Sequence, residues 1–308
     1  MTQLLPLDLA EVMFEELQRN RRPPDGLLHA SSHITGSLRH AMLDVANAPK
    51  IENEFISEMP LLIGHLIHSW LHNTLRNLGV HYSAEVNVTP GLPPGWGGTA
   101  DAVFWNPDLK AHVLVDFKTQ KGEGMRYIER GGAKKEHVAQ ASAYYYALEA
   151  MGYRMADKLA VFYIPKNETR SRDDIIMPLL VDFDPLPRDE LFTGMAERTD
   201  LTNAYLDTLP EPNPHALAPE AYLTDALAPV QDREQRIFFE KGSGTWTVKL
   251  MPHWSAAYCP YDTELCDCSD QGQTKIGEFD VDGQTYIPRK GYEGIRPTVF
   301  PALLEGDA

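Results

Sequence analysis

The sequence predicts an α/β fold, a mixed β-sheet flanked by helices, with a C-terminal appendage. Three observations support this prediction. The broadly apolar segment Leu61–Leu78 is typical of a buried helix. Three strand-like segments follow with short turns between them, which indicates an antiparallel meander. A further helical segment then leads to the apolar stretch Leu159–Ile164, which indicates a buried strand.

The individual elements follow from periodicity and from proline and glycine punctuation. We expect helices over Leu9–Leu17, Thr35–Ala48, Leu61–Leu78, Lys134–Met151, Asp189–Leu206 and near Gln231–Phe239. We expect strands over Tyr82–Thr89, Thr99–Trp105, His112–Thr119, Leu159–Ile164 and Ile175–Val181. Pro60 is expected to open the long helix and Gly79 to end it. The glycine-punctuated segment Gly122–Gly132 predicts a loop, and Asp282-Gly283 predicts a hairpin within Glu278–Ile287.

The proline-rich run Pro210–Pro214 predicts a domain boundary. We therefore expect an N-terminal helical segment over residues 1–60 that packs on the core. The core itself is expected over residues 61–212. A C-terminal appendage over residues 213–308 would carry the cysteines and the hairpin.

Composition limits the classes of function. The 308 residues include 28 basic and 44 acidic side chains, a formal net charge of −16, which argues against a general binder of phosphate backbones. A nuclease, however, needs positive potential only along its groove. The sequence has neither a long apolar run nor a signal-like N-terminus, so we expect no membrane association and a cytoplasmic location, in a bacterium or in the host cell of a virus.

Asp116 and Lys118 end an apolar strand and stand two residues apart. Residues i and i+2 of a strand project from the same face, so both side chains are expected to enter one site. Hydrolysis of a phosphodiester needs a hard divalent cation and a positive group that orients water or offsets developing charge. A carboxylate and a lysine meet both needs, although an isolated Asp-x-Lys is more often an ordinary ion pair.

Asp101 stands inside an otherwise apolar segment, three residues after Gly98. If its strand pairs with the strand of Asp116, the two carboxylates come close, and a metal ion would compensate their repulsion. The simpler interpretation is a turn residue at the edge of a strand.

Two helices carry further candidate side chains. His65, His68 and His72 lie on one side of the long helix, and their spacing does not decide which of them could bind an ion. Gln140 and Tyr144 share a face of the later helix and can hydrogen-bond phosphate or water. Each of these residues has an ordinary structural explanation when it is taken singly.

Taken together and in this order, the motifs Gly64-x-x-x-His68, Gly98-x-x-Asp101, Asp116-x-Lys118 and Gln140-x-x-x-Tyr144 resemble those of the RecB-type nucleases of the PD-(D/E)xK superfamily. The likeness covers about Leu61–Ile164. It implies a restriction-endonuclease-like core and an Mg²⁺- or Mn²⁺-dependent DNA hydrolase.

The resemblance also implies roles for individual residues. His68, Asp101 and Asp116 would bind the metal, together with the backbone carbonyl of Phe117. Lys118 would assist the attacking water. Gln140 and Tyr144 would support the site and the DNA, and Glu85 is left as an outer carboxylate.

Basic residues gather between these motifs in an otherwise acidic chain. Arg126, Arg130, Lys134 and Lys135 are candidates for contacts with nucleic acid, and Tyr127 could stack on an unpaired base. A solvated charged loop explains the same composition equally well.

The three cysteines, Cys259, Cys266 and Cys268, form a candidate second metal site. RecB-type relatives often hold an iron–sulfur cluster with four cysteines, one of them ahead of the motif helix, but no cysteine occurs around Ala30–Arg39. Zinc could be bound by the three thiolates with His253, His33 or His40. We expect no metal here in preference to zinc, and zinc in preference to a cluster.

The sequence thus predicts a metal-dependent deoxyribonuclease, an exonuclease or a single-strand-preferring nuclease, acting in DNA replication, recombination or repair. One alternative is an inactive nuclease fold that binds nucleic acid or serves in assembly. Another is a zinc-stabilised interaction protein in which the motifs are coincidental. Cleavage of labelled DNA that depends on a divalent metal separates the three.

Overall fold

The computed structural model describes residues 25–48, 55–166, 177–210, 219–222, 233–240, 245–252 and 274–279. The chain divides into two compact units. The first unit takes Met1–Asp25, Glu52–Gly91 and Thr99–Pro185, and the second takes Gly26–Ile51, Leu92–Gly98 and Leu186–Ala308. The domain limits that we expect from the sequence remain predictions.

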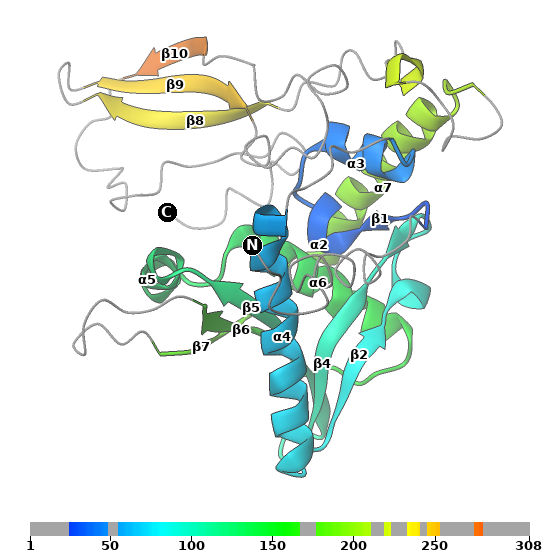
Figure 1. Ribbon diagram of the computed structural model, residues 1–308, viewed down its shortest axis with the longest axis vertical. Coiled ribbons are helices and arrows are strands. Elements are labelled where there is room, and N and C mark those ends of the chain that lie inside the picture. The colour runs from blue at the N-terminus through cyan, green and yellow to red at the C-terminus, as the bar shows by residue number, and fades with distance from the viewer. Residues whose placement is uncertain are drawn as a thin grey trace, which may run out of the picture. The chain divides into compact units, whose positions relative to one another are not determined.

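The first unit is built on a mixed five-stranded sheet (Figure 1). In spatial order its strands are β2 (Tyr82–Asn87), β4 (Thr99–Asn106), β5 (Ala111–Gln120), β6 (Leu159–Pro165) and β7 (Leu179–Phe183). The pairs β2/β4 and β4/β5 are antiparallel, which confirms the predicted meander. The pair β5/β6 is parallel and β6/β7 is antiparallel, so the sheet is mixed as predicted.

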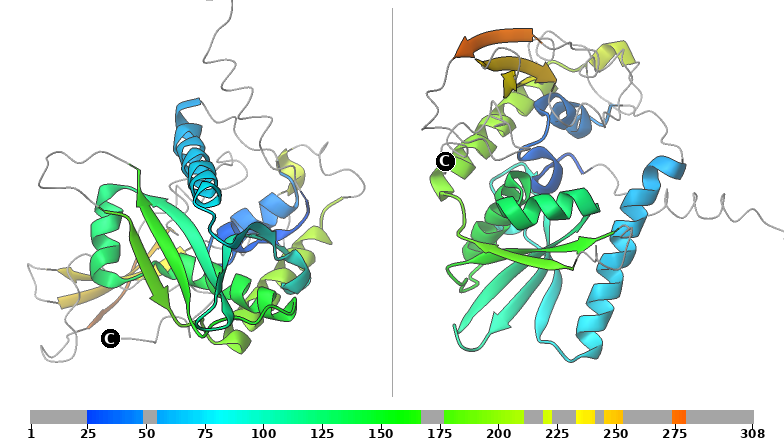
Figure 2. Two further views of the ribbon diagram at one scale, coloured as in Figure 1. Left: turned by 90° about the horizontal axis from the view of Figure 1, so that it is seen from below. Right: turned by 90° about the vertical axis from the view of Figure 1, so that its left-hand side faces the viewer.

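Helices cover both faces of this sheet, which confirms the predicted α/β class (Figure 2). On one face α4 (Phe55–Asn77) packs Leu71 and Leu75 against a core cluster that contains Ala102, Val115 and Phe117. The opposite face carries α5 (Gly122–Gly131) and α6 (Lys135–Ala150). Alternate residues of β5 therefore face different helices, as the pleat requires.

The long helix α4 begins at Phe55, so the prediction that Pro60 opens it was wrong. Its end is as predicted, because Gly79 adopts a left-handed φ of 69° that favours glycine. The N–H of Val80 then donates to the carbonyl of Leu75 at 3.1 Å and satisfies one of the last helical carbonyls. This helix carries the three histidines.

Two further predictions were wrong. The segment Gly122–Gly132, predicted to be a loop, contains the helix α5, because Met125 and Ile128 lie three residues apart and are both buried against β6. The segment near Gln231–Phe239, predicted to be helical, contains the strand β8 (Arg233–Glu240), which pairs along its length with β9 (Thr245–Pro252). In both segments tertiary pairing overrides the local signal.

The second unit combines short elements with one long helix. Strands β1 (Leu28–His29) and β3 (Trp96–Gly97) form a parallel pair. A separate antiparallel sheet contains β10 (Thr274–Phe279), β9 and β8, in this order. The helices of this unit are α2 (Ala30–His33), α3 (Leu38–Val45), α7 (Arg188–Leu206) and the 3-10 turn Pro219–Tyr222. The buried guanidinium of Arg198 on α7 donates to the carbonyl of Gly36 at 2.7 Å and so ties α7 to the loop before α3.

Among the helices of the described residues, none combines the length and the apolar character needed to cross a bilayer.

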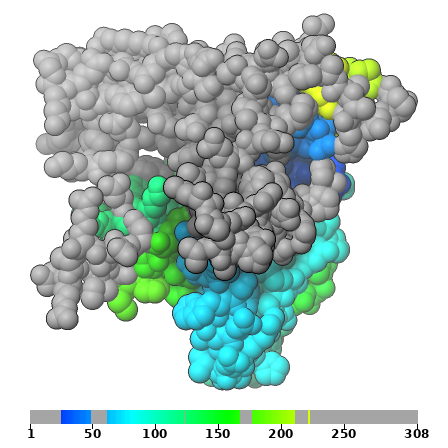
Figure 3. All heavy atoms as spheres, viewed as in Figure 1, coloured from blue at the N-terminus to red at the C-terminus, as the bar shows by residue number. Residues whose placement is uncertain are grey.

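In the first unit, part of the surface formed by α4 and β2 is visible in cyan in Figure 3. Leu66 and Trp70 of α4 are exposed. The predicted first helix over Leu9–Leu17, the cysteines and the tip of the predicted C-terminal hairpin lie outside the described residues.

Candidate active site

The register of β4 and β5 explains why Asp101 and Asp116 meet. The paired residues run from Asn106 opposite Ala111 to Ala102 opposite Val115. One step further would set Asp101 opposite Asp116, but the paired positions end there. Instead, the backbone N–H of Phe117 donates to Oδ2 of Asp101 at 2.6 Å, so this carboxylate occupies the place of a strand carbonyl. Asp101 can therefore be approached from both faces of the sheet.

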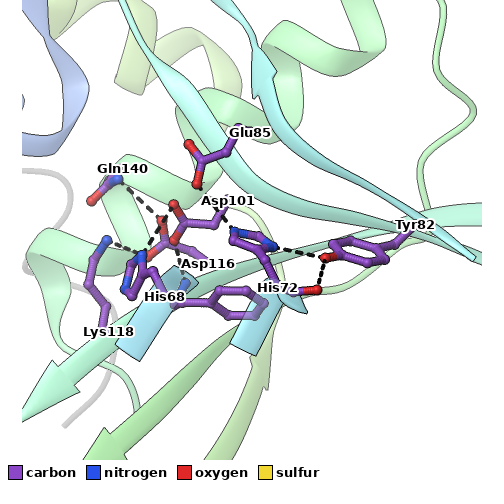
Figure 4. A network of polar contacts seen from close by, with 9 residues as sticks. His68, His72, Tyr82, Glu85, Asp101, Asp116, Lys118 and Gln140 are labelled. Carbon is purple, nitrogen blue, oxygen red and sulfur yellow. Dashed lines mark hydrogen bonds and ion pairs between the residues drawn. The ribbon is translucent and has the colours of Figure 1, made fainter. Parts of the chain in front are cut away.

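Asp116 is held between Lys118 and Gln140 (Figure 4). Its Oδ1 accepts a hydrogen bond of 3.2 Å from Nε2 of Gln140 on α6. Its buried Oδ2 lies 2.6 Å from Nζ of Lys118, and no other donor among the described residues reaches it. One ammonium does not use both lone pairs of this oxygen, so Oδ2 keeps capacity to bind a cation.

His68 approaches Asp101 from the other face of the sheet. Its Nδ1 lies 4.0 Å from Oδ1 of Asp101, and its ring meets that of Phe117 edge to face at 5.9 Å. Gly64, one turn earlier, is close to β5, since a Cβ there would lie 3.5 Å from the Thr119 hydroxyl. The structure thus brings together the histidine and both aspartates that the resemblance selected.

Burial dominates the electrostatics of these groups. It raises the pKa of Asp101 and that of Asp116 from 3.8 to about 6, against the opposing charge of Lys118. Burial also lowers the pKa of His68, and the charge of Lys118 lowers it further. The site therefore combines two desolvated carboxylates with a neutral imidazole.

Glu85 lies beside the same site in an unusual backbone conformation. The residues around it pair Ala84 with Ala102 and Val86 with Ala100, so its register position is opposite Asp101. Its φ of 50° is left-handed, which costs a non-glycine residue about 1 kcal/mol or more. Glu85, Asp101 and Asp116 thus occupy one row across three neighbouring strands.

His72 connects Glu85 to the long helix. Its Nε2 lies 3.2 Å from Oε1 of Glu85 and its Nδ1 lies 3.0 Å from the hydroxyl of Tyr82, which donates in turn to the carbonyl of His72 at 3.1 Å. Tyr82 and Glu85 are three residues apart, so a regular strand would turn them to opposite faces. The left-handed residue allows both to contact His72.

The two predicted residues of α6 lie beside Asp116. Tyr144 is buried, and burial together with the charge of Asp116 raises the pKa of its phenol, while hydrogen bonds to Gln140 and to the backbone of Thr99 oppose this shift. Gln140 is therefore placed between the carboxylate of Asp116 and the phenol. The structure thus places Gln140 and Tyr144 beside Asp116 and Lys118.

No protein-family model matches the chain, and no curated protein matches it in sequence. Two solved structures of an alkaline exonuclease, LHK-Exo, are similar to part of it. One is LHK-Exo in complex with dAMP, with 14% identity, 59% of this chain and 88% of that chain covered, and a TM-score of 0.40. The other is LHK-Exo from Laribacter hongkongensis, with 11% identity, coverage of 60% and 89%, and a TM-score of 0.38.

The remaining predicted residues are distributed over two helices. Arg126 and Arg130 lie on α5 with exposed side chains, Lys135 is the exposed first residue of α6, and Lys134 precedes it. Nζ of Lys134 donates to Oε1 of Gln120 at 3.1 Å. Lys134 thereby lies at the carboxyl ends of β5 and β6.

Sequence reasoning missed the supporting role of several residues. The spacing of the histidines did not separate His72 from His68, and Tyr82 was not predicted to support the site. His72 was recognisable only as the next histidine on the stripe, whereas its partners Tyr82 and Glu85 lie on a different element. The signal that could have drawn attention to them was the polar side chain of Glu85 in the first strand, opposite Asp101.

Proposed function

We propose that this protein is a metal-dependent DNA nuclease that hydrolyses phosphodiester bonds at Asp101 and Asp116. One observation carries the proposal: two carboxylates with exposed fractions of only 15% and 1% lie at the point where β4 and β5 stop pairing, with Lys118 as their close cation. Such desolvated carboxylates are costly to keep ionised unless a cation is bound. A purely structural ion pair would need one carboxylate beside Lys118, not two buried carboxylates.

The residues present fit a divalent cation. As the side chains stand, no three His, Cys, Asp or Glu of the described residues converge on one point. However, the buried Oδ2 of Asp116 has Lys118 as its close partner among the described residues and keeps a lone pair for a cation, and Asp101 accepts from the backbone N–H of Phe117. Oxygen ligands suit Mg²⁺ or Mn²⁺, and a neutral imidazole suits Mn²⁺. Asp101, Asp116 and His68 would hold the ion, which when bound polarises a phosphoryl oxygen and lowers the pKa of water.

The other side chains have distinct tasks around this centre. Lys118 places an ammonium next to Asp116, where it would orient the attacking water or offset charge on the phosphate. Gln140 fixes one oxygen of Asp116 and so its rotamer, and Tyr144 supports Gln140 from the buried side. His72 fixes α4 against β2 one turn beyond His68, which sets the position of His68.

DNA is the proposed partner because basic side chains gather near the site, although the chain as a whole is acidic. Arg126, Arg130, Lys134 and Lys135 lie on α5 and at the start of α6, on the face of the sheet that Asp116 and Lys118 also occupy. A strand bound there would lie beside Lys118. We further propose an exonuclease or a single-strand-preferring nuclease that acts in replication, recombination or repair.

The test is degradation of labelled linear DNA by the full-length protein with Mg²⁺, Mn²⁺, Ca²⁺ or chelator. We expect cleavage with Mg²⁺ or Mn²⁺ and none with Ca²⁺ or chelator. Binding of DNA without cleavage would favour the alternative of an inactive nuclease fold. Neither binding nor cleavage under any of these conditions would exclude both, and would favour the zinc-stabilised interaction protein.

A further inference from the structure

His137 lies in a fixed position beside the proposed site and is not among the residues that would bind the metal or orient the water. It lies in the first turn of α6, and its ring packs on that of Tyr163 with centroids 5.5 Å apart. Its Nδ1 lies 2.8 Å from the hydroxyl of Tyr163. Tyr163 on β6 is the register partner of Lys118 on β5, so the histidine stands over the strand position next to the proposed catalytic lysine.

The hydrogen bonds of Tyr163 determine the tautomer of His137. The hydroxyl of Tyr163 accepts a hydrogen bond of 3.0 Å from the backbone N–H of Lys134, which can only donate. Tyr163 is fully buried, and within the described residues Nδ1 of His137 is the acceptor within reach of its hydroxyl proton, so the hydroxyl donates to an unprotonated Nδ1. The ring proton of the neutral imidazole therefore resides on Nε2. Turning the ring over would place a carbon against the hydroxyl and forfeit this bond.

The surroundings of His137 keep the ring neutral. Burial, followed by the charges of Lys118 and Lys134, holds its pKa well below the usual value. Within the described part of the chain, Nε2 has no hydrogen-bond partner. The result is a neutral N–H donor of fixed direction, next to two ammonium groups, on the face of the sheet that carries Asp116 and Lys118.

We propose that His137 is a substrate-binding residue whose Nε2–H donates to a phosphate oxygen of the DNA strand adjacent to the phosphate at Lys118. This assignment rests on the proposed nuclease function. A non-bridging phosphate oxygen is an acceptor only, and it satisfies a neutral donor and the neighbouring ammonium groups together. The site selects the neutral donor because a third cation beside Lys118 and Lys134 would repel them. Tyr163 acts through His137 and is a positioning residue.

The tautomer is tested without any catalysis. Two-dimensional ¹⁵N–¹H spectra of the histidine side chains of the full-length protein, assigned by comparison with His137→Leu, should show His137 as the Nε2–H tautomer at neutral pH. The Tyr163→Phe variant, which removes the hydroxyl, should shift His137 toward a mixture of tautomers. An Nδ1–H tautomer or an imidazolium in the wild type would overturn the proposal.

The phosphate contact is tested by the affinity for a short fluorescein-labelled single-stranded oligonucleotide, measured in Ca²⁺ and again in chelator. His137→Leu should weaken binding about tenfold or more, as expected when a hydrogen bond to a charged group is lost. His137→Gln, which keeps an N–H near the Nε2 position, should bind within a few-fold of the wild type. His81→Leu, which removes an exposed histidine at the start of β2, is the matched control and should bind normally.

The possible failures are distinguishable. If the wild type cleaves DNA but His137→Leu binds the oligonucleotide as tightly as the wild type does, the assignment of His137 is wrong and the nuclease function stands. Equal weakening by the Leu and Gln variants would show a structural role only, and would also overturn the proposal. A wild type that neither binds nor cleaves DNA refutes both.

Discussion

Replacing Asp116 with asparagine should stabilise the metal-free protein while abolishing its proposed activity. The carboxyl is 1% exposed, and burial raises its pKa from 3.8 to about 6. Asparagine has nearly the shape of the protonated acid and keeps an oxygen that can accept from Gln140. The substitution therefore removes the charge and keeps the side-chain shape, and the partly exposed ammonium of Lys118, which would now face an amide N–H, has to turn away.

The size of the effect follows from linkage. The rise of the pKa of Asp116 from 3.8 to about 6 corresponds to about 3 kcal/mol. Ionisation of Asp116 lowers the free energy of unfolding by this amount. Because the folded state binds this proton more tightly than the unfolded state does, stability is lost as pH rises from about 4 to about 6. The favourable charge of Lys118 is already contained in this shift, because it is one of the causes that oppose the effect of burial. Asp116→Asn should thus recover about 3 kcal/mol near pH 8 and almost nothing near pH 4.

The assay is thermal unfolding of both proteins in chelator at the two pH values. Near pH 8 the midpoint of the variant should be higher by roughly 5–10 °C. Asp108→Asn, which changes an exposed carboxylate in the turn between β4 and β5, is the control and should have no effect at either pH. Added Mg²⁺ or Mn²⁺ should raise the midpoint of the wild type but not that of Asp116→Asn. An equal shift at both pH values, or destabilisation near pH 8, would refute this reasoning.

Three further predictions concern the metal, the lysine and the cysteines. Because the pKa values of Asp101 and Asp116 are about 6, Mn²⁺ affinity measured by calorimetry should fall as pH drops below about 6, where protons compete with the metal; an unchanged affinity near pH 5 would contradict this. Lys118→Ala should reduce cleavage at least about a hundredfold at saturating metal, the scale of losing one positioned electrostatic group, and should leave Mn²⁺ affinity within a few-fold; a matching loss of Mn²⁺ affinity would make the lysine structural. Protein purified without oxygen should be colourless, because four thiolates are needed for a cluster and the chain has three, and Cys259→Ser should leave cleavage nearly unchanged; a brown protein bleached by that substitution would refute this.

Much of the fold was accessible from local pattern alone. The strands around Asp101 and Asp116, the helix that carries Gln140 and the end of the long helix at Gly79 follow from periods of 2.0 and 3.6 and from glycine punctuation. Where the local signal and the tertiary partner disagree, the partner prevails. Glycines in α5 suggested a loop, yet burial of Met125 and Ile128 against β6 makes it a helix.

The sequence by itself determined the chemical inventory of the candidate site. An Asp-x-Lys at the end of an apolar strand, an aspartate in the strand before it and a histidine stripe on a long helix are all visible in the printed chain. Their order also suffices for the resemblance to RecB-type nucleases. These features are local, so one-dimensional reasoning reaches them.

Only the tertiary structure decided how these groups are arranged. The register of β4 against β5 brings Asp101 close to Asp116 where the pairing ends, and His68 from the opposite face approaches Asp101 there. The left-handed turn at Glu85 and the bond from Tyr163 to His137 join elements far apart in sequence. Register and tautomer depend on partners that no local pattern specifies, because each is fixed by a hydrogen bond between two separate elements.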